Sequence, residues 1–177
     1  WVCDTDESRA RKTGSREEVD WYTDPESAIT ATPDVVHVNT PPFTHKDLTL
    51  NSLAAGANVL LEKPAAMTVE EVDTLIEADN SSSQKVCLVH NNLYFDPMLE
   101  VLQSINRGEF GEIQGVRSFL GGSPSEETRD WSQQSHGGPI GDRLPHPIYL
   151  VTHFINDISD RHDRSEERRV GKECRSR

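Results

Sequence analysis

The chain has 177 residues, the length of about one domain, and at a mean hydropathy of -0.64 it contains no apolar run long enough to span a membrane. Its formal net charge of -12 disfavours nonspecific binding to nucleic acid or to an anionic lipid surface. These values leave a soluble globular protein as the predicted class.

The cysteines are few and far apart: Cys3, Cys87 and Cys174. No CxxC pair occurs, and the odd count argues against a disulfide framework or a zinc site built from thiolates. We therefore expect a reducing, cytoplasmic environment. No leader of charged and then apolar residues is visible, but the chain opens at Trp1 rather than methionine, so an export signal ahead of it stays open.

From Val2 to His90, short apolar runs alternate with segments of helical periodicity. Thr68 and Glu71 form a capping box, and Gly56 is a stop signal. In chain order the predicted elements are a strand end at WVCD, a helix in ESRARKTG with Gly14 after it, a short helix over 24–31, a strand at PDVVHV, a helix over 44–57 with Thr44 as N-cap, a strand at NVLLEKP that ends at Pro64, a helix from Thr68 and a strand over 85–90.

This alternation predicts an α/β fold. Strand, helix and strand follow one another at close spacing, which requires right-handed crossovers and a parallel sheet. The short strands of such a sheet are expected to be buried on both faces, because helices normally cover both sides.

The pattern changes after His90. We predict a helix over 97–106 with Gly108 beyond its end, then a strand over 112–120, where apolar residues alternate with period two. Residues 121–141 are rich in serine, glycine and polar residues and include Trp131, which is typical of a long loop over a site or of a disordered loop. Residues 146–155 have a helical, apolar pattern.

The final segment, 164–177, reads RSEERRVGKECRSR and has no hydrophobic period. Its composition predicts a solvated tail, and the alternative is a basic tail that binds nucleic acid. The string also resembles the translation of a common sequencing-library adapter. We interpret it as non-native and expect it to be extended, without buried side chains.

Polar segments follow the three predicted strands after Pro33. They are Asn39-Thr40-Pro41-Pro42 with the nearby His45, Glu62-Lys63-Pro64, and His90-Asn91-Asn92. In an open parallel sheet, ligands bind outside the carboxyl ends of the strands, so these segments are candidates for a ligand site. The alternative for any one of them is that strand ends are polar because they leave the core.

Lys63 is the most specific candidate for the ligand site. The following proline holds it extended at a sheet edge, where partial burial lowers a lysine pKa. Its alternative role is an ion pair with Glu62 or a helix carboxylate. Asp142 and His146 stand at i and i+4, so a helix beginning near Asp142 places them on one face. That pair fits a catalytic dyad, a metal site or a helix-start salt bridge, and no HExxH motif or tight histidine cluster supports a metal.

Several strings together resemble the glucose-fructose oxidoreductase and inositol dehydrogenase (Gfo/Idh/MocA) family of NAD(P)-dependent oxidoreductases. The strings are TPPFTH, EKP followed by AAMTVEEV, HNNLYFDP, GEFGEIQGV and GGPIGDRLPH. The resemblance implies a truncated Rossmann-type parallel sheet over 1–92, which binds nucleotide, followed over 93–163 by the start of an α+β open-faced sheet domain that binds substrate and makes oligomer contacts.

The resemblance also implies roles for individual residues. Lys63 would contact the nicotinamide and the reacting oxygen, Asp142 and His146 would face the substrate, and the Lys63-Pro64 peptide would be cis. Asp4 matches the acidic position that binds the adenosine ribose, which favours NAD over NADP. The full set of implied cofactor-binding residues is Asp4, Asn39, Thr40, Pro41, His45, Glu62, Lys63 and Asn91.

The implied activity is hydride transfer between NAD or NADP and a sugar, cyclitol or related polyol, by a full-length protein that forms homo-oligomers. Four departures from the family pattern bear on it: the chain contains no GxGxxG, His136-Gly137-Gly138 stands where three glycines are usual, Leu144 stands where glycine is usual, and Tyr149 stands where a second aspartate is frequent. These departures leave the substrate open and keep an inactive nucleotide-binding sensor or co-regulator as the alternative. They also predict a fragment that lacks the N-terminal glycine-rich unit and most of the C-terminal domain.

Overall fold

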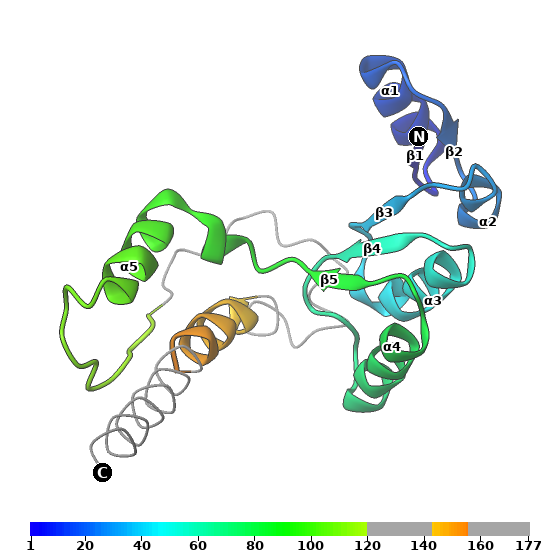
Figure 1. Ribbon diagram of the computed structural model, residues 1–177. Helices are drawn as coiled ribbons and strands as arrows, with labels where there is room; N and C mark the ends of the chain where they lie inside the picture. The colour runs from blue at the N-terminus through cyan, green and yellow to red at the C-terminus, as the bar shows by residue number, and fades with distance from the viewer. Residues whose placement is uncertain (120–142, 156–177) are drawn as a thin grey trace, which may run out of the picture. The chain divides into compact units, whose positions relative to one another are not determined.

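The computed structural model describes residues 1–119 and 143–155 (Figure 1). It divides the chain into two compact units, Trp1–Val89 and His90–Arg177, and each is described by itself below. The predicted loop over 121–141, the candidate residue Asp142 and the tail over 164–177 lie outside the described residues.

The first unit alternates strands and helices, as predicted. The short predicted helix over 24–31 is present as α2, and each longer apolar run forms a strand. Its elements are β1 (Val2–Cys3), α1 (Glu7–Glu17), β2 (Trp21–Tyr22), α2 (Pro25–Ile29), β3 (Val35–Val38), the 3₁₀ turn η1 (Pro42–Thr44), α3 (His45–Ala54), β4 (Asn58–Leu61), α4 (Val69–Ser81) and β5 (Val86–Leu88).

All strand pairs in this unit are parallel, which confirms the predicted α/β class. β1 pairs with β2, and β3, β4 and β5 form a second sheet in that order. In the second sheet Val38 lies opposite Leu61, and Leu61 lies opposite Leu88. Because the strands are parallel and in this register, the segments that follow β3 and β4 leave the sheet at the same edge.

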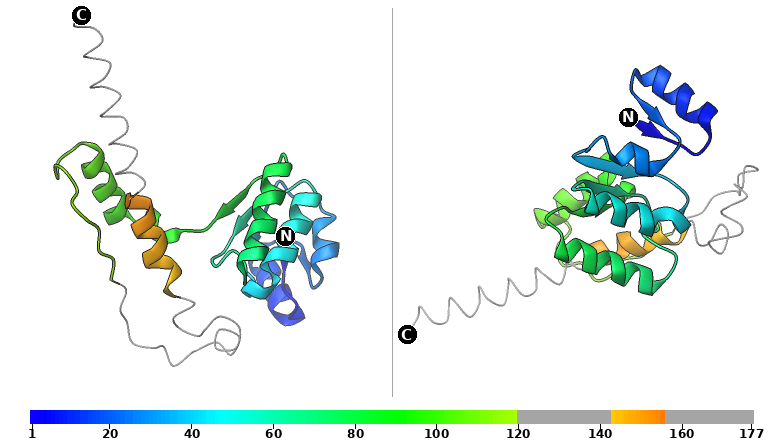
Figure 2. Two further views of the ribbon diagram at one scale, coloured as in Figure 1. Left: turned by 90° about the horizontal axis from the view of Figure 1, so that it is seen from below. Right: turned by 90° about the vertical axis from the view of Figure 1, so that its right-hand side faces the viewer.

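One face of the β3–β4–β5 sheet carries the core. Val59 and Leu61 are fully buried there and pack with Leu53 of α3 and Leu75 of α4. Figure 2 shows α3 and α4 side by side against this sheet. Burying a side chain such as Leu61 contributes about 1.5–3 kcal/mol to stability, so this layer is the main source of stability in the unit.

The opposite face of the same sheet differs from the prediction. Val35, which is 58% exposed, and the exposed His37 and Cys87 project from it. The expectation that these strands are buried on both faces is therefore wrong for β3 and β5. Side chains alternate between the two faces of a strand, and α3 and α4 both cover the same face, so only every second residue is buried.

The helix caps follow the sequence signals with one correction. Thr68 accepts a hydrogen bond from the Glu71 backbone N–H at 3.2 Å, and the Glu71 carboxylate accepts from the backbone N–H groups of Thr68, as in the predicted capping box, and of Met67, at 3.0 Å. Thr44 precedes α3 as predicted, yet its hydroxyl donates to the Pro41 carbonyl at 2.7 Å instead of capping the helix. Gly56, with φ of 88°, follows α3 as the predicted stop.

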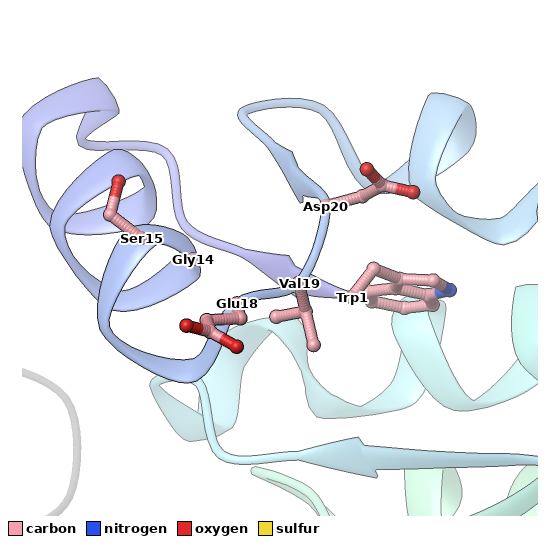
Figure 3. A pocket seen from close by; sticks show the side chains of 6 residues that line it. All are labelled: Trp1, Gly14, Ser15, Glu18, Val19 and Asp20. Atoms are coloured by element: carbon pink, nitrogen blue, oxygen red, sulfur yellow. The ribbon is translucent and has the colours of Figure 1, made fainter.

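Gly14 does not end its helix as predicted. Helix α1 continues to Glu17 and ends at Glu18, which takes the left-handed conformation at φ 55°. Gly14 is instead the point where α1 approaches β2, beside a shallow hollow lined by Trp1, Ser15, Glu18, Val19 and Asp20 (Figure 3). The glycine is required by close packing, since a Cβ there would lie 2.9 Å from the Trp21 Cβ and 2.9 Å from the Val19 carbonyl oxygen.

We expect Gly14→Ala to destabilise the protein by about 1–3 kcal/mol, because overpacking at this contact outweighs the higher helix propensity of alanine, worth about 1 kcal/mol. Ser15→Ala, at the exposed neighbouring position of α1, is the matched control and should change stability by no more than about 0.5 kcal/mol. Urea unfolding monitored by circular dichroism measures both. A Gly14→Ala protein as stable as the wild type would show that α1 can move away from β2 at little cost.

The second unit contributes the 3₁₀ turn η2 (Asn91–Tyr94), α5 (Asp96–Asn106) and helical residues 145–155. The predicted helices over 97–106 and 146–155 are confirmed, and Gly108 follows α5 with φ of 74°. The predicted strand over 112–120 is wrong for residues 112–119, which carry no strand assignment. Alternation alone does not make a strand: a strand also needs a hydrogen-bonded neighbouring strand, and the described part of this unit contains none.

Within the described ranges, no helix is long and apolar enough to cross a membrane.

Candidate functional site

Two of the predicted polar segments meet at the carboxyl edge of the β3–β4–β5 sheet. Asn39-Thr40-Pro41 follows β3, and Glu62-Lys63-Pro64 follows β4. The Glu62 backbone N–H donates to the Val38 carbonyl at 3.0 Å, so the strand pairing continues to the start of the second segment. The structure therefore brings together the two segments in which sequence analysis placed most of the candidate cofactor residues.

His45, the first residue of α3, ties these two segments to each other. Its Nδ1 lies 2.8 Å from the Pro64 carbonyl oxygen and its Nε2 lies 2.7 Å from the Thr40 carbonyl oxygen. The ring is 0% exposed. Sequence analysis assigned His45 to cofactor binding, but in this structure the side chain has no surface with which to touch a ligand. The buried ring instead supports the two turns by contacting one carbonyl oxygen in each.

Lys63 lies half-buried in the turn after β4, and the Lys63-Pro64 peptide bond is cis, as the resemblance implies. The Glu62 carboxylate accepts a hydrogen bond from the Lys63 backbone N–H at 3.2 Å. That contact orients the Glu62 side chain toward its own backbone, so Glu62 helps to shape the turn that presents Lys63.

Asp4 follows β1 and is held by Arg9 from α1. The Arg9 Nε lies 3.1 Å from Oδ2 and its Nη2 lies 3.0 Å from Oδ1 of Asp4, while the Asp6 backbone N–H donates to Oδ1 at 2.9 Å. The Arg9 hydrogen bonds are the main reason that the pKa of the Asp4 carboxyl is below its ordinary value. Asp4 is thus an ionised, oriented acceptor at a strand end.

The third predicted segment, His90-Asn91-Asn92, belongs to the second unit and meets Tyr149 there. The Tyr149 ring, 8% exposed, stacks on the His90 ring with centroids 4.2 Å apart and planes 19° apart. The Asn92 backbone N–H donates to the Tyr149 hydroxyl at 3.2 Å, and that hydroxyl donates to the Asn91 Oδ1 at 3.2 Å. The same hydroxyl lies 2.9 Å from the Nδ1 of His146.

Burial lowers the pKa of His90 below its ordinary value, because a partly desolvated imidazole favours its neutral form. The neutral form of the ring that stacks on Tyr149 is therefore favoured. His146, half-buried on the helix over 145–155, is oriented through its Nδ1 by the tyrosine hydroxyl. Asp142, its predicted partner, lies outside the described residues.

Sequence analysis singled out His146 and Asn91 but treated Tyr149 only as a departure from a family pattern. The spacing held a signal, since residues at i and i+3 share one face of a helix and His146 and Tyr149 have that spacing. His90 gave a weaker signal as the last residue of an apolar run. The contact between these residues depends on the folding of two segments more than 50 residues apart, which no local pattern reports.

Comparison with known proteins gives a consistent result. A family model described as "Oxidoreductase family, NAD-binding Rossmann fold" matches residues 1–90. The D-xylose dehydrogenase of Paenarthrobacter nicotinovorans is 23% identical over 162 residues, which is 86% of this chain and 42% of that protein. This chain spans less than half the length of the curated relatives it matches.

Solved structures share the fold. The crystal structure of an NAD binding oxidoreductase from Klebsiella pneumoniae superposes with a TM-score of 0.66 at 24% identity, covering 84% of this chain and 42% of that one. The myo-inositol 2-dehydrogenase from Lactobacillus plantarum gives a TM-score of 0.59 at 22% identity, covering 63% of this chain and 34% of that one.

Proposed function

Because the chain belongs to the Gfo/Idh/MocA oxidoreductase family, with an NAD-binding Rossmann fold over residues 1–90, we propose that the whole protein is a dehydrogenase of a sugar, cyclitol or related polyol. Relatives of this chain include dehydrogenases of D-xylose and of myo-inositol. The proposed reaction moves a hydride from a carbinol carbon of the substrate to a nicotinamide ring, while the hydroxyl proton goes to a protein base.

The observation that carries this proposal is the pair of turns at the carboxyl edge of the parallel sheet. Thr40 and Pro64 lie in different turns, yet both of their carbonyl oxygens contact the same buried imidazole, that of His45. A rigid edge of this kind is where open parallel sheets bind ligands. This edge presents Lys63 from a turn that His45 supports, and a group that acts on a reacting atom needs accurate placement.

The residues of this chain fit part of a nicotinamide dinucleotide site. An ionised carboxylate that accepts hydrogen bonds, such as Asp4, suits a ribose hydroxyl, which supports NAD over NADP, while Arg9 beside it offsets part of the repulsion that a 2′-phosphate would meet. Asn39, Thr40, Pro41, Glu62, Lys63 and Asn91 are the other proposed contacts, and His45 supports them from beneath. The nicotinamide, when bound, supplies the hydride acceptor.

We assign the proton chemistry to three side chains. His146 would accept the hydroxyl proton of the substrate, Asp142 would orient the imidazole and balance its charge, and Lys63 would donate a hydrogen bond to the reacting oxygen. The support from this structure is the orientation of His146 through its Nδ1 and the contact of the buried His45 ring with the Pro64 carbonyl oxygen in the turn that carries Lys63.

A nucleotide-binding sensor without turnover is the second candidate, favoured by one observation. Tyr149 occupies the position where a second aspartate is frequent in the family, and it fills that space with a buried, neutral ring. Steady-state assays of the whole protein with NAD and a panel of sugars, cyclitols and polyols separate the two. Turnover of any of them supports the dehydrogenase, and NAD binding without turnover of any supports the sensor.

We expect the 177-residue chain by itself to bind NAD weakly or not at all. It contains no GxGxxG, and the backbone N–H groups of that turn form the pyrophosphate site in Rossmann folds. Isothermal titration calorimetry of this chain with NAD measures the affinity directly. A micromolar dissociation constant would mean that the described residues hold the pyrophosphate by another route.

A further inference from the structure

The Tyr149 hydroxyl is surrounded by more hydrogen-bonding groups than a phenol normally meets. It lies 3.2 Å from the Asn92 backbone nitrogen, 3.2 Å from the Asn91 side-chain oxygen and 2.9 Å from the His146 Nδ1. A phenol has one hydrogen to donate and two lone pairs. These three contacts are enough to use that capacity, so the role of each of the three constrains the other two.

Two of the three roles follow from the partners themselves. The Asn92 backbone N–H can only donate, so it takes one lone pair of the hydroxyl oxygen. The Asn91 side chain presents Oδ1, which can only accept, so it takes the hydroxyl hydrogen. The one capacity left for His146 is the second lone pair. Its Nδ1 must then carry a hydrogen and donate it to Tyr149.

We propose that Tyr149 is a positioning residue that, together with Asn91, keeps a proton on the Nδ1 of His146, so that His146 exchanges protons with its substrate at Nε2. A neutral imidazole carries one hydrogen, and a hydrogen fixed on Nδ1 leaves the lone pair on Nε2. A general base needs that lone pair. The catalytic meaning of this assignment rests on the function proposed above, whereas the hydrogen-bond assignment itself does not.

The partner at the Nδ1 of His146 carries no charge, so the charge balance proposed for Asp142 would act without a hydrogen bond to that nitrogen. A carboxylate at position 149 would stabilise the imidazolium form, but a phenol satisfies Nδ1 as a neutral partner. The ring of Tyr149 is held in place separately from its hydroxyl, by its stack on His90 at 4.2 Å. Tyr149→Phe therefore removes the hydroxyl and leaves the aromatic packing in place.

Two-dimensional NMR that correlates imidazole ring protons with their nitrogens tests the proposal on the isotope-labelled 177-residue chain. The pH is held well above the ordinary imidazole pKa of about 6.5, so that the rings are neutral. The His146 signals are identified by their loss in His146→Gln. We expect the wild-type chain to show His146 predominantly in the Nδ1–H form.

Two variants are expected to change the tautomer of His146 in different ways. Asn91→Leu removes the acceptor, which frees the tyrosine hydrogen to donate to Nδ1 and shifts His146 to the Nε2–H form. Tyr149→Phe removes the partner and abolishes the preference for Nδ1–H. Tyr94→Phe makes the same substitution at a 71% exposed tyrosine and should leave the His146 signals unchanged.

A wild-type His146 predominantly in the Nε2–H form would overturn the proposal, whether or not any variant folds. The proposal would also be overturned by an Nδ1–H form that persists unchanged in both Asn91→Leu and Tyr149→Phe. Asn91 is exposed, so its replacement does not disturb a core. Because these measurements need no turnover, they succeed or fail independently of the dehydrogenase assays.

In an active whole protein, Tyr149→Phe should lower kcat while the KM for the nicotinamide cofactor changes little, because the hydroxyl acts only through His146. Equal losses in kcat and in cofactor affinity would show a general structural role and would overturn the positioning role.

Discussion

Replacement of His45 by alanine is expected to lower the free energy of unfolding by about 2–5 kcal/mol, the largest stability effect of any single substitution considered in this protein. The ring is completely buried, so its removal leaves a cavity, and the carbonyl oxygen of Thr40 or Pro64 that accepts the ring N–H loses its hydrogen bond. Each buried polar group left without a hydrogen bond costs about 1–3 kcal/mol, and the cavity adds to that cost. Urea or thermal unfolding of the 177-residue chain measures the change.

His37→Ala is the matched control. His37 lies on the exposed face of β3 in the same unit, so the same substitution there should change stability by no more than about 0.5 kcal/mol. The two variants also separate a supporting role from direct contact with a cofactor. If His45 contacted the cofactor, His45→Ala would weaken NAD binding by the whole protein and leave its unfolding free energy near that of the wild type.

Replacement of His146 by alanine should lower kcat of the whole enzyme by about a hundredfold or more, while cofactor affinity changes far less. The loss of a positioned general base typically costs that much, and the imidazole is oriented through Nδ1 by Tyr149. Steady-state kinetics, divided by the fraction of folded protein, give the effect for each folded molecule.

His153→Ala is the control, since His153 is an exposed histidine on the same helix. It should leave kcat close to that of the wild type. A structural role for His146, in a helix-start salt bridge, makes a different prediction: a stability loss of about 1 kcal/mol and unchanged turnover for each folded molecule. Unchanged turnover in His146→Ala would remove it from the proposed mechanism.

Most elements of the first unit could be predicted because their signals are local. Asp24 accepts from the Ser27 backbone N–H at 2.8 Å, and Thr68 accepts from that of Glu71 at 3.2 Å, so each cap is formed by residues three positions apart. Helix α5 likewise begins with Asp96 and Pro97, a favoured pair for a first helical turn. Signals of this range are visible in the sequence before any tertiary contact forms.

The wrong predictions concern features that depend on neighbours. Gly14 resembles a helix stop, yet α1 passes through it, because the position is defined by contact with Trp21 of β2. Residues 112–119 alternate as a strand would, but a strand exists only with a hydrogen-bonded partner. The exposed face of β3 and β5 depends on which side α3 and α4 pack, and the hydrophobic pattern of a short strand does not specify that.

For the candidate site, the sequence by itself determined which residue types stand at the strand ends, and so the positions of Thr40, Lys63, Asn91 and His146 as candidates. Only the tertiary structure decided what these residues do for one another. The His45 ring reaches carbonyls 5 and 19 positions away, and the Tyr149 hydroxyl meets residues 57 and 58 positions away. Hydrogen bonds have a reach of about 3 Å, so partners this distant in sequence can be recognised only after the chain has folded.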